Sequence, residues 1–201
     1  MQKKEKDLKT IINSGNMFRK NLSNKSLLII SGSINAPNVN EIEFQNSNFL
    51  HLTGVVTKVN ANNFMRMLEK SRIKISDWDY RKDGTTQLKL RILPDIVNIH
   101  NRAKMIGVYD KRRVFMSTDL CIGNTFCYLG LIKTNRITNR NNNVYVPNTS
   151  IASNIISDTN SRERILAIYR KDKNKIKYDD LTYLAKGIDK QYIEEVFKNY
   201  F

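Results

Sequence analysis

The sequence has few of the residues that build disulfide-rich, collagen-like or membrane-spanning proteins. Its 201 residues include 2 cysteines, 3 prolines and 8 glycines. Cys121 and Cys127 match no CxxC metal or redox spacing, so we expect two buried thiols rather than a disulfide framework. The longest apolar runs, such as 27–30, are far shorter than the about 20 residues that a bilayer-spanning helix needs. We therefore expect no membrane span.

The N-terminus also lacks an export signal. Residues 1–7 are mostly charged, and the apolar patch that follows them is broken by Asn and Ser. A secretory signal needs an apolar core and a small-residue cleavage site, and neither is present. We therefore expect a cytoplasmic protein.

The strongest compositional feature is the positive charge. Lys and Arg total 34 against 19 Asp and Glu, which gives a formal net charge of +15. The apolar share of 40% and the charged share of 26% are those of a globular chain, so disorder is not expected. A charge excess of this size indicates a polyanionic partner, although a solvated basic surface would give the same count.

Helical patterns come before strand patterns along the chain. Apolar residues recur at helical spacing in 5–24, in 61–72 behind a capping Asn60, and again in 88–99. Residues 27–34 form a buried strand pattern, and short strand-like segments continue after about residue 105. These later segments are 114–116, 125–132, 144–146, 164–171 and 177–184, and a last helical pattern follows at 190–201.

This order predicts one α+β fold, with N-terminal helices packed on a C-terminal antiparallel sheet. We expect residues 1–40 to form a helix and strand extension, and residues 41–201 to form the main α+β domain.

Basic and aromatic residues are interleaved in the predicted sheet half. This mixture supplies cations for phosphates beside rings for base stacking, which suits RNA or a single strand. The usual DNA-reading modules are absent, including zinc-finger spacings and a basic region with heptads. The predicted nucleic-acid-binding residues are Arg136, Arg140, Arg164, Arg170, Lys173, Lys175 and Lys177.

Only two histidines are present, and imidazole is the side chain whose ordinary titration lies near neutrality. His51 stands between two leucines and directly before Thr53 and Gly54. On a strand, its ring would point away from those leucines, beside a hydroxyl and a flexible backbone. That placement fits either a catalytic group or a satisfied structural histidine. His100 follows a predicted helix and indicates a surface or capping position.

Carboxylates are poorly placed for a metal centre. Two-metal nucleases need several clustered carboxylates, and the nearest candidates are Asp77 with Asp79 and Glu41 with Glu43. We therefore expect no metal and no other cofactor. Metal-free phosphodiester cleavage suits RNA, because its 2′-hydroxyl is a built-in nucleophile. It needs one group to remove that proton, another to protonate the leaving 5′-oxygen, and cations to stabilise the phosphorane.

Strand alternation in 164–171 places Tyr169 and Lys171 on one face. A phenol and an ammonium at an exposed strand end can supply a proton donor and a phosphorane clamp. An amphipathic strand edge with a snorkelling lysine gives the same pattern. Lys186 and Lys89 are further cations, for which plain surface charge is the alternative.

Several short strings occur in an order that resembles a known nuclease family. They are FLHLTG at 49–54, LKL at 88–90 with LP at 93–94, KMIG at 104–107, YVPNT at 145–149, ILAI at 165–168 with Lys171, and YLAKG at 183–187. Together they resemble the phage and mobile-element branch of the barnase, EndoU, colicin-ribonuclease and RelE-like nucleases, specifically its fourth phage subgroup. The similarity covers about residues 40–190.

The resemblance implies a nuclease-like α+β domain that cleaves RNA without a metal on the open face of its sheet. It implies His51 as general acid or base, Lys171 and Lys186 as phosphorane stabilisers, and Tyr169 as a hydroxyl partner or stacking platform. Carried onto this chain, the catalytic residues would be His51, Thr53, Tyr169, Lys171, Lys186 and Lys89. Barnase and EndoU have a further catalytic Glu or His that this chain lacks, so one proton-transfer role is unfilled.

We therefore expect a phage or mobile-element endoribonuclease acting on structured RNA, as a toxin or as a counter-defence factor that trims a guide RNA. The alternative is a non-enzymatic inhibitor that binds RNA or a ribonucleoprotein such as a CRISPR effector, for example an anti-CRISPR protein that blocks guide loading. A DNA-associated recombination or replication accessory is a third possibility. The enzyme hypothesis requires His51 to meet Tyr169, Lys171 and Lys186 around one phosphate.

Overall fold

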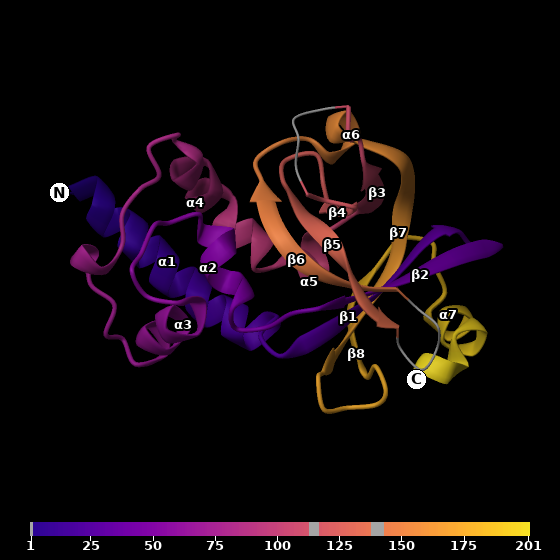
Figure 1. Cartoon of the computed structure of the whole chain (residues 1–201). Coiled ribbons are helices and arrows are strands. Elements are labelled where there is room, and N and C mark those ends of the chain that lie inside the picture. The colour runs from indigo at the N-terminus through magenta and orange to yellow at the C-terminus, as the bar shows by residue number, and fades with distance from the viewer. Residues whose placement is uncertain (1, 113–116, 138–142) are drawn as a thin grey trace.

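A computed structural model gives the structure of residues 2–112, 117–137 and 143–201. Within these ranges, the helices of residues 2–96 form a layer at one side of a closed barrel of seven strands (Figure 1). The helices are α1 (Gln2–Asn21), α2 (Asn48–Thr53), α3 (Ala61–Glu69), α4 (Thr85–Ile96), α5 (Ile99–Arg102), α6 (Ile155–Asp158) and α7 (Lys190–Val196), with 3₁₀ turns η1 (Ile75–Asp77) and η2 (Lys198–Tyr200).

The barrel closes because β1 pairs on both of its edges. The strands neighbour one another in the order β1-β2-β6-β5-β4-β3-β7, and β7 pairs back onto β1. Every pairing is antiparallel except that of β2 with β6. The strands are β1 (Lys25–Ser33), β2 (Ala36–Glu43), β3 (Met105–Tyr109), β4 (Leu120–Gly123), β5 (Tyr128–Ile137), β6 (Asn143–Ile151), β7 (Thr159–Asp172) and β8 (Asp180–Leu184), which extends the sheet beside β7.

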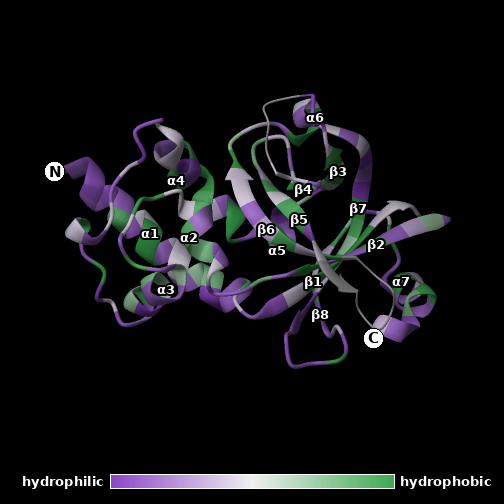
Figure 2. Ribbon diagram, viewed as in Figure 1, coloured by the Kyte–Doolittle hydropathy of each residue, from purple (hydrophilic) through white to green (hydrophobic). Residues whose placement is uncertain are grey.

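Both faces of β1 are buried. Leu27 and Ile29 belong to the main core, which fills the barrel and continues under the helical layer. Leu28 and Ile30 point the other way, into a second core covered by the C-terminal segment that contains α7. This explains the unbroken apolar run in the sequence, and Figure 2 shows green stretches on the barrel strands. Burial of each such side chain contributes about 1.5–3 kcal/mol.

The helical layer is held together at α1, which contacts both α3 and α4. The layer meets the barrel through α2 and α4, which both pack on β6. The predicted cap of α3 is confirmed, because the Asn60 side chain accepts a hydrogen bond from the Asn63 N–H at 2.9 Å.

The predicted α+β composition is confirmed, but the predicted arrangement of the sheet is wrong. The sheet closes on itself, it contains the N-terminal strands β1 and β2, and one of its pairings is parallel. The boundary expected between residues 40 and 41 falls inside β2. Hydrophobic periodicity could not predict that the sheet closes, because closure depends on the pairing of β1 with β7, which are far apart in sequence.

His51 was considered above as a residue of a strand, and this expectation is wrong as well. Residues 48–53 form α2, which ends at Gly54 in the left-handed region with φ 66°. Phe49, Leu52 and Thr53 are its buried residues, so the helical spacing was present in the string. In a segment of six residues, the same apolar positions fit both the alternation of a strand and the period of a helix, so the pattern alone does not distinguish the two. The strand expected at 114–116 lies outside the described residues.

Two further expectations from composition can be compared with the structure. Cys121 and Cys127 are buried free thiols, as predicted. Burial raises the pKa of each thiol to about 12. Among the described helices, none combines the length and the apolar character needed to cross a membrane.

Candidate active site at the junction of α2, α4 and β6

An exposed imidazole lies where α2, α4 and β6 meet. His51 is on the solvent side of α2, while Phe49 and Leu52 of the same helix are fully buried in the main core. Because α2 packs its buried face against both α4 and β6, His51 is left on the outer side of the helix. The left-handed Gly54 then turns the chain away directly after the helix.

Lys89 reaches this junction from α4. Its ammonium donates one hydrogen bond to the His51 carbonyl oxygen at 3.1 Å and another to Thr149 Oγ1 at 3.0 Å. One cation therefore joins α2, α4 and β6. Burial lowers the pKa of Lys89 below its ordinary value, and the positive charge of Arg81 lowers it further, against the opposing effect of Asp83.

Gly54 leaves room for the Lys89 side chain. A Cβ at position 54 would lie 2.7 Å from Lys89 Cδ, well inside van der Waals contact. The φ of 66° at this position also favours glycine. The Gly54 carbonyl accepts a hydrogen bond from Thr86 Oγ1 at 2.7 Å, which ties the turn to the start of α4.

Thr53 supports the turn from the inside. It is fully buried, and its hydroxyl donates to the Leu50 carbonyl at 2.7 Å and accepts from the Val55 N–H at 3.3 Å. On β6, the Ser150 hydroxyl donates to the Leu52 carbonyl at 3.0 Å. Thr53 therefore positions α2, whereas His51 is exposed at the junction and Lys89 is half-buried there.

Thr149 was not among the predicted site residues. It lies in β6, and its hydroxyl accepts the hydrogen bond from Lys89. Its sequence signal was the YVPNT string, which places a hydroxyl two residues after Pro147 in a strand-like segment. Nothing in the sequence indicated that this hydroxyl would meet a lysine from α4.

Tyr169 and Lys171 lie elsewhere, on β7. Tyr169 is 1% exposed and its ring centroid lies 4.4 Å from that of Phe201, within the second core. Burial raises the pKa of its phenol, with Glu194 adding to the rise. The Lys171 ammonium donates to the Ile176 carbonyl at 3.1 Å. Both residues are thus engaged beside β1 and the C-terminal segment.

The structure does not bring these β7 residues together with His51, so the expected meeting of His51 with Tyr169, Lys171 and Lys186 around one phosphate is wrong. Going around the barrel, β6 and β7 are separated by β1 and β2 on one side and by β3, β4 and β5 on the other. Lys186 follows β8, which pairs with β7. The sequence had placed the meeting point on an open face of β7, but the C-terminal segment covers that face. Of the predicted catalytic residues, only His51, Thr53 and Lys89 come together.

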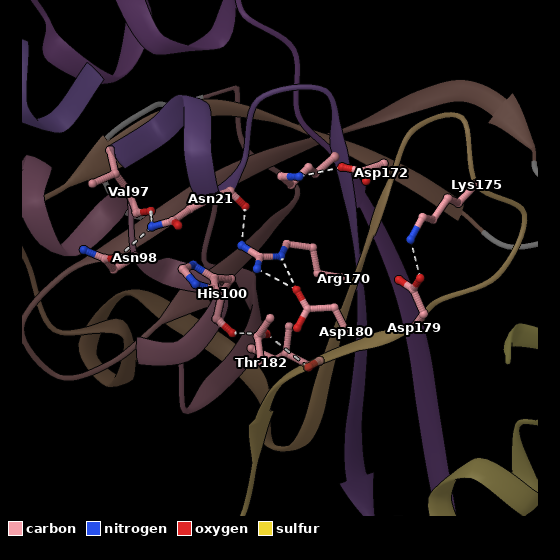
Figure 3. Close-up of polar contacts among 12 residues, drawn as sticks. Asn21, Val97, Asn98, His100, Arg170, Asp172, Lys175, Asp179, Asp180 and Thr182 are labelled. Carbon is pink, nitrogen blue, oxygen red and sulfur yellow. Dashed lines mark hydrogen bonds and ion pairs between the residues drawn. The ribbon is translucent and has the colours of Figure 1, made fainter. Parts of the chain in front are cut away.

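Arg170 is part of an internal polar network, shown in Figure 3. Its Nε and Nη2 donate to Asp180 Oδ2 at 2.8 and 2.5 Å, and its Nη1 donates to the Asn21 carbonyl at 2.9 Å. These bonds tie the end of α1 to β7 and β8.

The other predicted nucleic-acid-binding residues differ in their surroundings. Lys173 and Lys177 are exposed in the connection between β7 and β8, and Lys175 in the same connection pairs with Asp179 (Figure 3). Arg136 belongs to β5, but its side chain lies outside the described residues, as does all of Arg140.

His100 was expected at the surface, and that prediction is wrong. It is 6% exposed, and its carbonyl accepts a hydrogen bond from Thr182 Oγ1 at 2.7 Å (Figure 3). Its Nδ1 finds no hydrogen-bond partner among the described residues. Burial lowers the pKa of His100 to about 4, the nearby Arg170 lowers it as well, and Asp180 acts in the opposite direction.

The acidic residues considered as metal ligands have other partners. Asp79 Oδ1 pairs with Lys4 Nζ at 3.3 Å, and Glu41 Oε2 accepts from the Tyr178 hydroxyl at 2.9 Å. Over residues 2–112, 117–137 and 143–201, no three His, Cys, Asp or Glu side chains are grouped so that they could hold a metal ion.

Comparison with known families identifies the class of protein. A family model described as phage-Barnase-EndoU-ColicinE5/D-RelE like nuclease 4 matches residues 10–187. No curated protein and no solved structure gives a match. The matched range contains α2, α4 and β6, and it confirms the family suspected from the short strings. The chain therefore belongs to the phage-type nucleases of the barnase, EndoU, colicin E5/D and RelE-like class.

Proposed function

We propose that this nuclease cleaves RNA without a metal ion, at the junction of α2, α4 and β6. One observation carries the proposal: the Lys89 ammonium is bound to Thr149 and to the backbone carbonyl of His51, the residue that carries the exposed imidazole. An imidazole and an ammonium can supply the general base and the general acid of transesterification through a 2′-hydroxyl.

In the first half of the reaction, His51 acts as general base. Its imidazole removes the proton of the 2′-hydroxyl, and the 2′-oxygen attacks the adjacent phosphorus. The P–O5′ bond then breaks, which leaves a 2′,3′-cyclic phosphate on one product. Because the nucleophile belongs to the substrate, the site does not have to generate a hydroxide ion, and DNA is not a substrate for this chemistry.

In the second half, Lys89 gives a proton to the leaving 5′-oxygen, which departs as a 5′-hydroxyl. Two of its three ammonium hydrogens bond His51 and Thr149, so the third can point at the scissile group. A lysine with a lowered pKa is a stronger acid than an ordinary lysine, which suits it to this transfer. Lys89 thereby fills the proton-transfer role for which the sequence offered no residue.

The test is cleavage of total cellular RNA and of a structured guide RNA by the pure protein in EDTA. We expect products with 2′,3′-cyclic phosphate and 5′-hydroxyl ends. His51→Ala and Lys89→Met should each lower the cleavage rate by about 100-fold or more, as removal of a general acid or base does. Lys82→Met, an exposed lysine in the turn before α4, is the matched control and should cleave like the parent.

Cleavage by His51→Ala at the parent rate would refute the proposed site. Cleavage that stops in EDTA would refute the metal-free mechanism. A protein that binds the guide RNA but leaves it at full length would instead be the non-enzymatic inhibitor, for which RNA or a ribonucleoprotein is the partner.

A further inference from the structure

A cavity of about 330 Å³ opens into the barrel away from the helical layer. β1 follows α1 and β2 leads into α2, so the turn between β1 and β2 is the part of this hairpin farthest from the helical layer (Figure 1). The cavity lies beside that turn, and we call it the barrel mouth. Its lining includes Asn38, Asn40, Ile106, Val108, Leu120 and Glu163.

An apolar wall forms one side of the barrel mouth. Ile106 of β3 and Leu120 of β4 belong to the main core that fills the barrel. Val108 is the register partner of Leu120, and partners on neighbouring strands point to the same face of a sheet. Val108 is nevertheless 47% exposed, so this part of the wall is in contact with solvent.

Polar groups of β1, β2 and β7 form the other side. Glu163 is the register partner of Ile106 and therefore faces the barrel interior. Its Oε2 accepts a hydrogen bond from the Ser31 hydroxyl at 2.7 Å, and its Oε1 accepts one from Asn38 Nδ2 at 2.6 Å. Because Ser31 is fully buried, these bonds hold the carboxylate in place. Asn40 adds a second amide to the lining.

The Glu163 carboxylate has no cationic partner, although the chain contains 34 lysines and arginines. It forms no ion pair with any residue that the structure describes. A carboxylate offers about four acceptor positions, and Ser31 and Asn38 use one on each oxygen. Both oxygens can therefore accept a further hydrogen bond. A half-buried carboxylate opposite an apolar wall suits a flat ligand with two adjacent N–H donors.

The backbone of β7 is irregular beside this carboxylate. The register of β7 on β3 shifts between Ile106 and Val108, next to Glu163. Ser161, in the same irregularity, has a φ of 46°, which residues other than glycine rarely adopt. Such bulges occur at the rims of barrels, where they direct a side chain toward a site.

We propose that the barrel mouth binds a guanine base, with the Glu163 carboxylate accepting hydrogen bonds from guanine N1–H and the N2 amino group. Among the four RNA bases, only guanine carries two adjacent donors on its Watson–Crick edge. The acceptor O6 follows them on that edge, and an amide of Asn38 or Asn40 can donate to it. The apolar wall covers the face of the ring, as in other pockets that read an unpaired base by its Watson–Crick edge.

The base can come from a free guanine nucleotide or from an unpaired guanosine in RNA. In taking RNA as one source, the inference rests on the proposed function. A net charge of +15 attracts the phosphate attached to such a base, whereas it repels a cationic ligand for Glu163. Because the barrel mouth lies away from the helical layer, a guanine bound there is not at the junction that holds His51.

The test is binding of guanosine, measured by isothermal titration calorimetry. Guanosine carries no phosphate, so it isolates recognition of the base. Inosine lacks the N2 amino group and adenosine has an acceptor at N1, so each should bind at least about 10-fold more weakly. Glu163→Gln should weaken guanosine binding about 10- to 150-fold, the effect of losing a hydrogen bond to a charged group. Glu195→Gln, an exposed glutamate of α7, is the matched control and should bind like the parent.

A second variant leaves the carboxylate in place. In Val108→Trp the indole fills the barrel mouth and should abolish guanosine binding. Ile156→Trp, at a 42% exposed position outside the lining, is its control and should bind like the parent. Urea unfolding shows beforehand that each variant is folded.

A fully 2′-O-methylated RNA of unpaired uridines with one guanosine distinguishes the two sources. Weaker binding when inosine replaces that guanosine, lost in Glu163→Gln, identifies RNA as the source; the same discrimination with the nucleosides alone identifies a free nucleotide. The proposal is overturned if neither probe shows discrimination that depends on Glu163, or if folded Val108→Trp binds like the parent. These outcomes are independent of cleavage: loss of the His51 dependence of cleavage refutes the proposed function alone.

Discussion

Gly54 offers the sharpest test of how the candidate active site is assembled. A Cβ at this position would lie 2.7 Å from Lys89 Cδ, so in Gly54→Ala the lysine must retreat by about 0.8 Å to reach the ~3.5 Å of a favourable carbon–carbon contact. That shift stretches its hydrogen bonds to His51 and Thr149, which measure 3.1 and 3.0 Å. The substitution therefore perturbs the position of the ammonium without removing it.

The expected magnitude has two parts. An alanine at φ 66° costs about 1–2 kcal/mol in backbone strain. Weakening two hydrogen bonds at a half-buried site adds about 1–2 kcal/mol. Gly84→Ala isolates the first part, because Gly84 has a φ of 76°, a Cβ there would meet no described atom within 4 Å, and it begins the same helix α4. Gly54→Ala should thus be destabilised about twice as much as Gly84→Ala.

Urea unfolding with an unchanged m-value measures these differences. In a Lys89→Ala background the steric part disappears, so Gly54→Ala should then cost only as much as Gly84→Ala. In the intact background, Gly54→Ala should also lower the rate of RNA cleavage by about 10-fold or more, because a misplaced catalytic group loses its alignment. Equal costs for Gly54→Ala and Gly84→Ala, with unchanged cleavage, would refute the reasoning.

Three further predictions concern stability. His100 has a pKa of about 4 in the folded protein against an ordinary 6.5, so as the pH falls the unfolded chain binds this proton first. The free energy of unfolding should therefore fall by up to about 3 kcal/mol between pH 6.5 and 4. His100→Asn should flatten this part of the pH dependence in a series of urea unfolding curves. Thr86→Val leaves the Arg81 N–H and the Gly54 carbonyl without their shared hydroxyl, so it should cost about 1–3 kcal/mol in urea unfolding, and a loss below about 0.5 kcal/mol would contradict the assigned bonds. Leu131→Ala opens a cavity in the fully buried barrel core and should cost about 2–5 kcal/mol by thermal melting, whereas a neutral result would contradict a packed interior.

Local features of the fold could be predicted from the sequence, whereas its closure could not. The apolar run at 27–30 indicated a buried strand, and the alternation at 164–171 indicated much of β7. Closure depends on β1 pairing with β7, and neither pattern specifies a partner. The string 49–54 fits both a strand and a helix, and packing against α4 and β6 selects the helix.

The candidate site was predicted in the same partial way. His51 and Lys89 were chosen for their chemistry, and the structure brings them together with Thr149. Tyr169 was chosen because strand alternation gave it an open face. That face is buried because Phe201 and the other residues of the C-terminal segment pack on it. Tertiary packing decides which face of a strand is covered by a segment distant in sequence. The pattern of residues in the strand does not show this.

The closure of the barrel has a consequence for how the protein is made. Lys25 of β1 and Asp172 of β7 are partners although they are 147 residues apart in sequence. During translation, β1 leaves the ribosome long before its partner, so the barrel cannot close until β7 has also been synthesised. A prematurely terminated chain would keep an unpaired strand edge, which favours aggregation and proteolysis over a partly assembled nuclease.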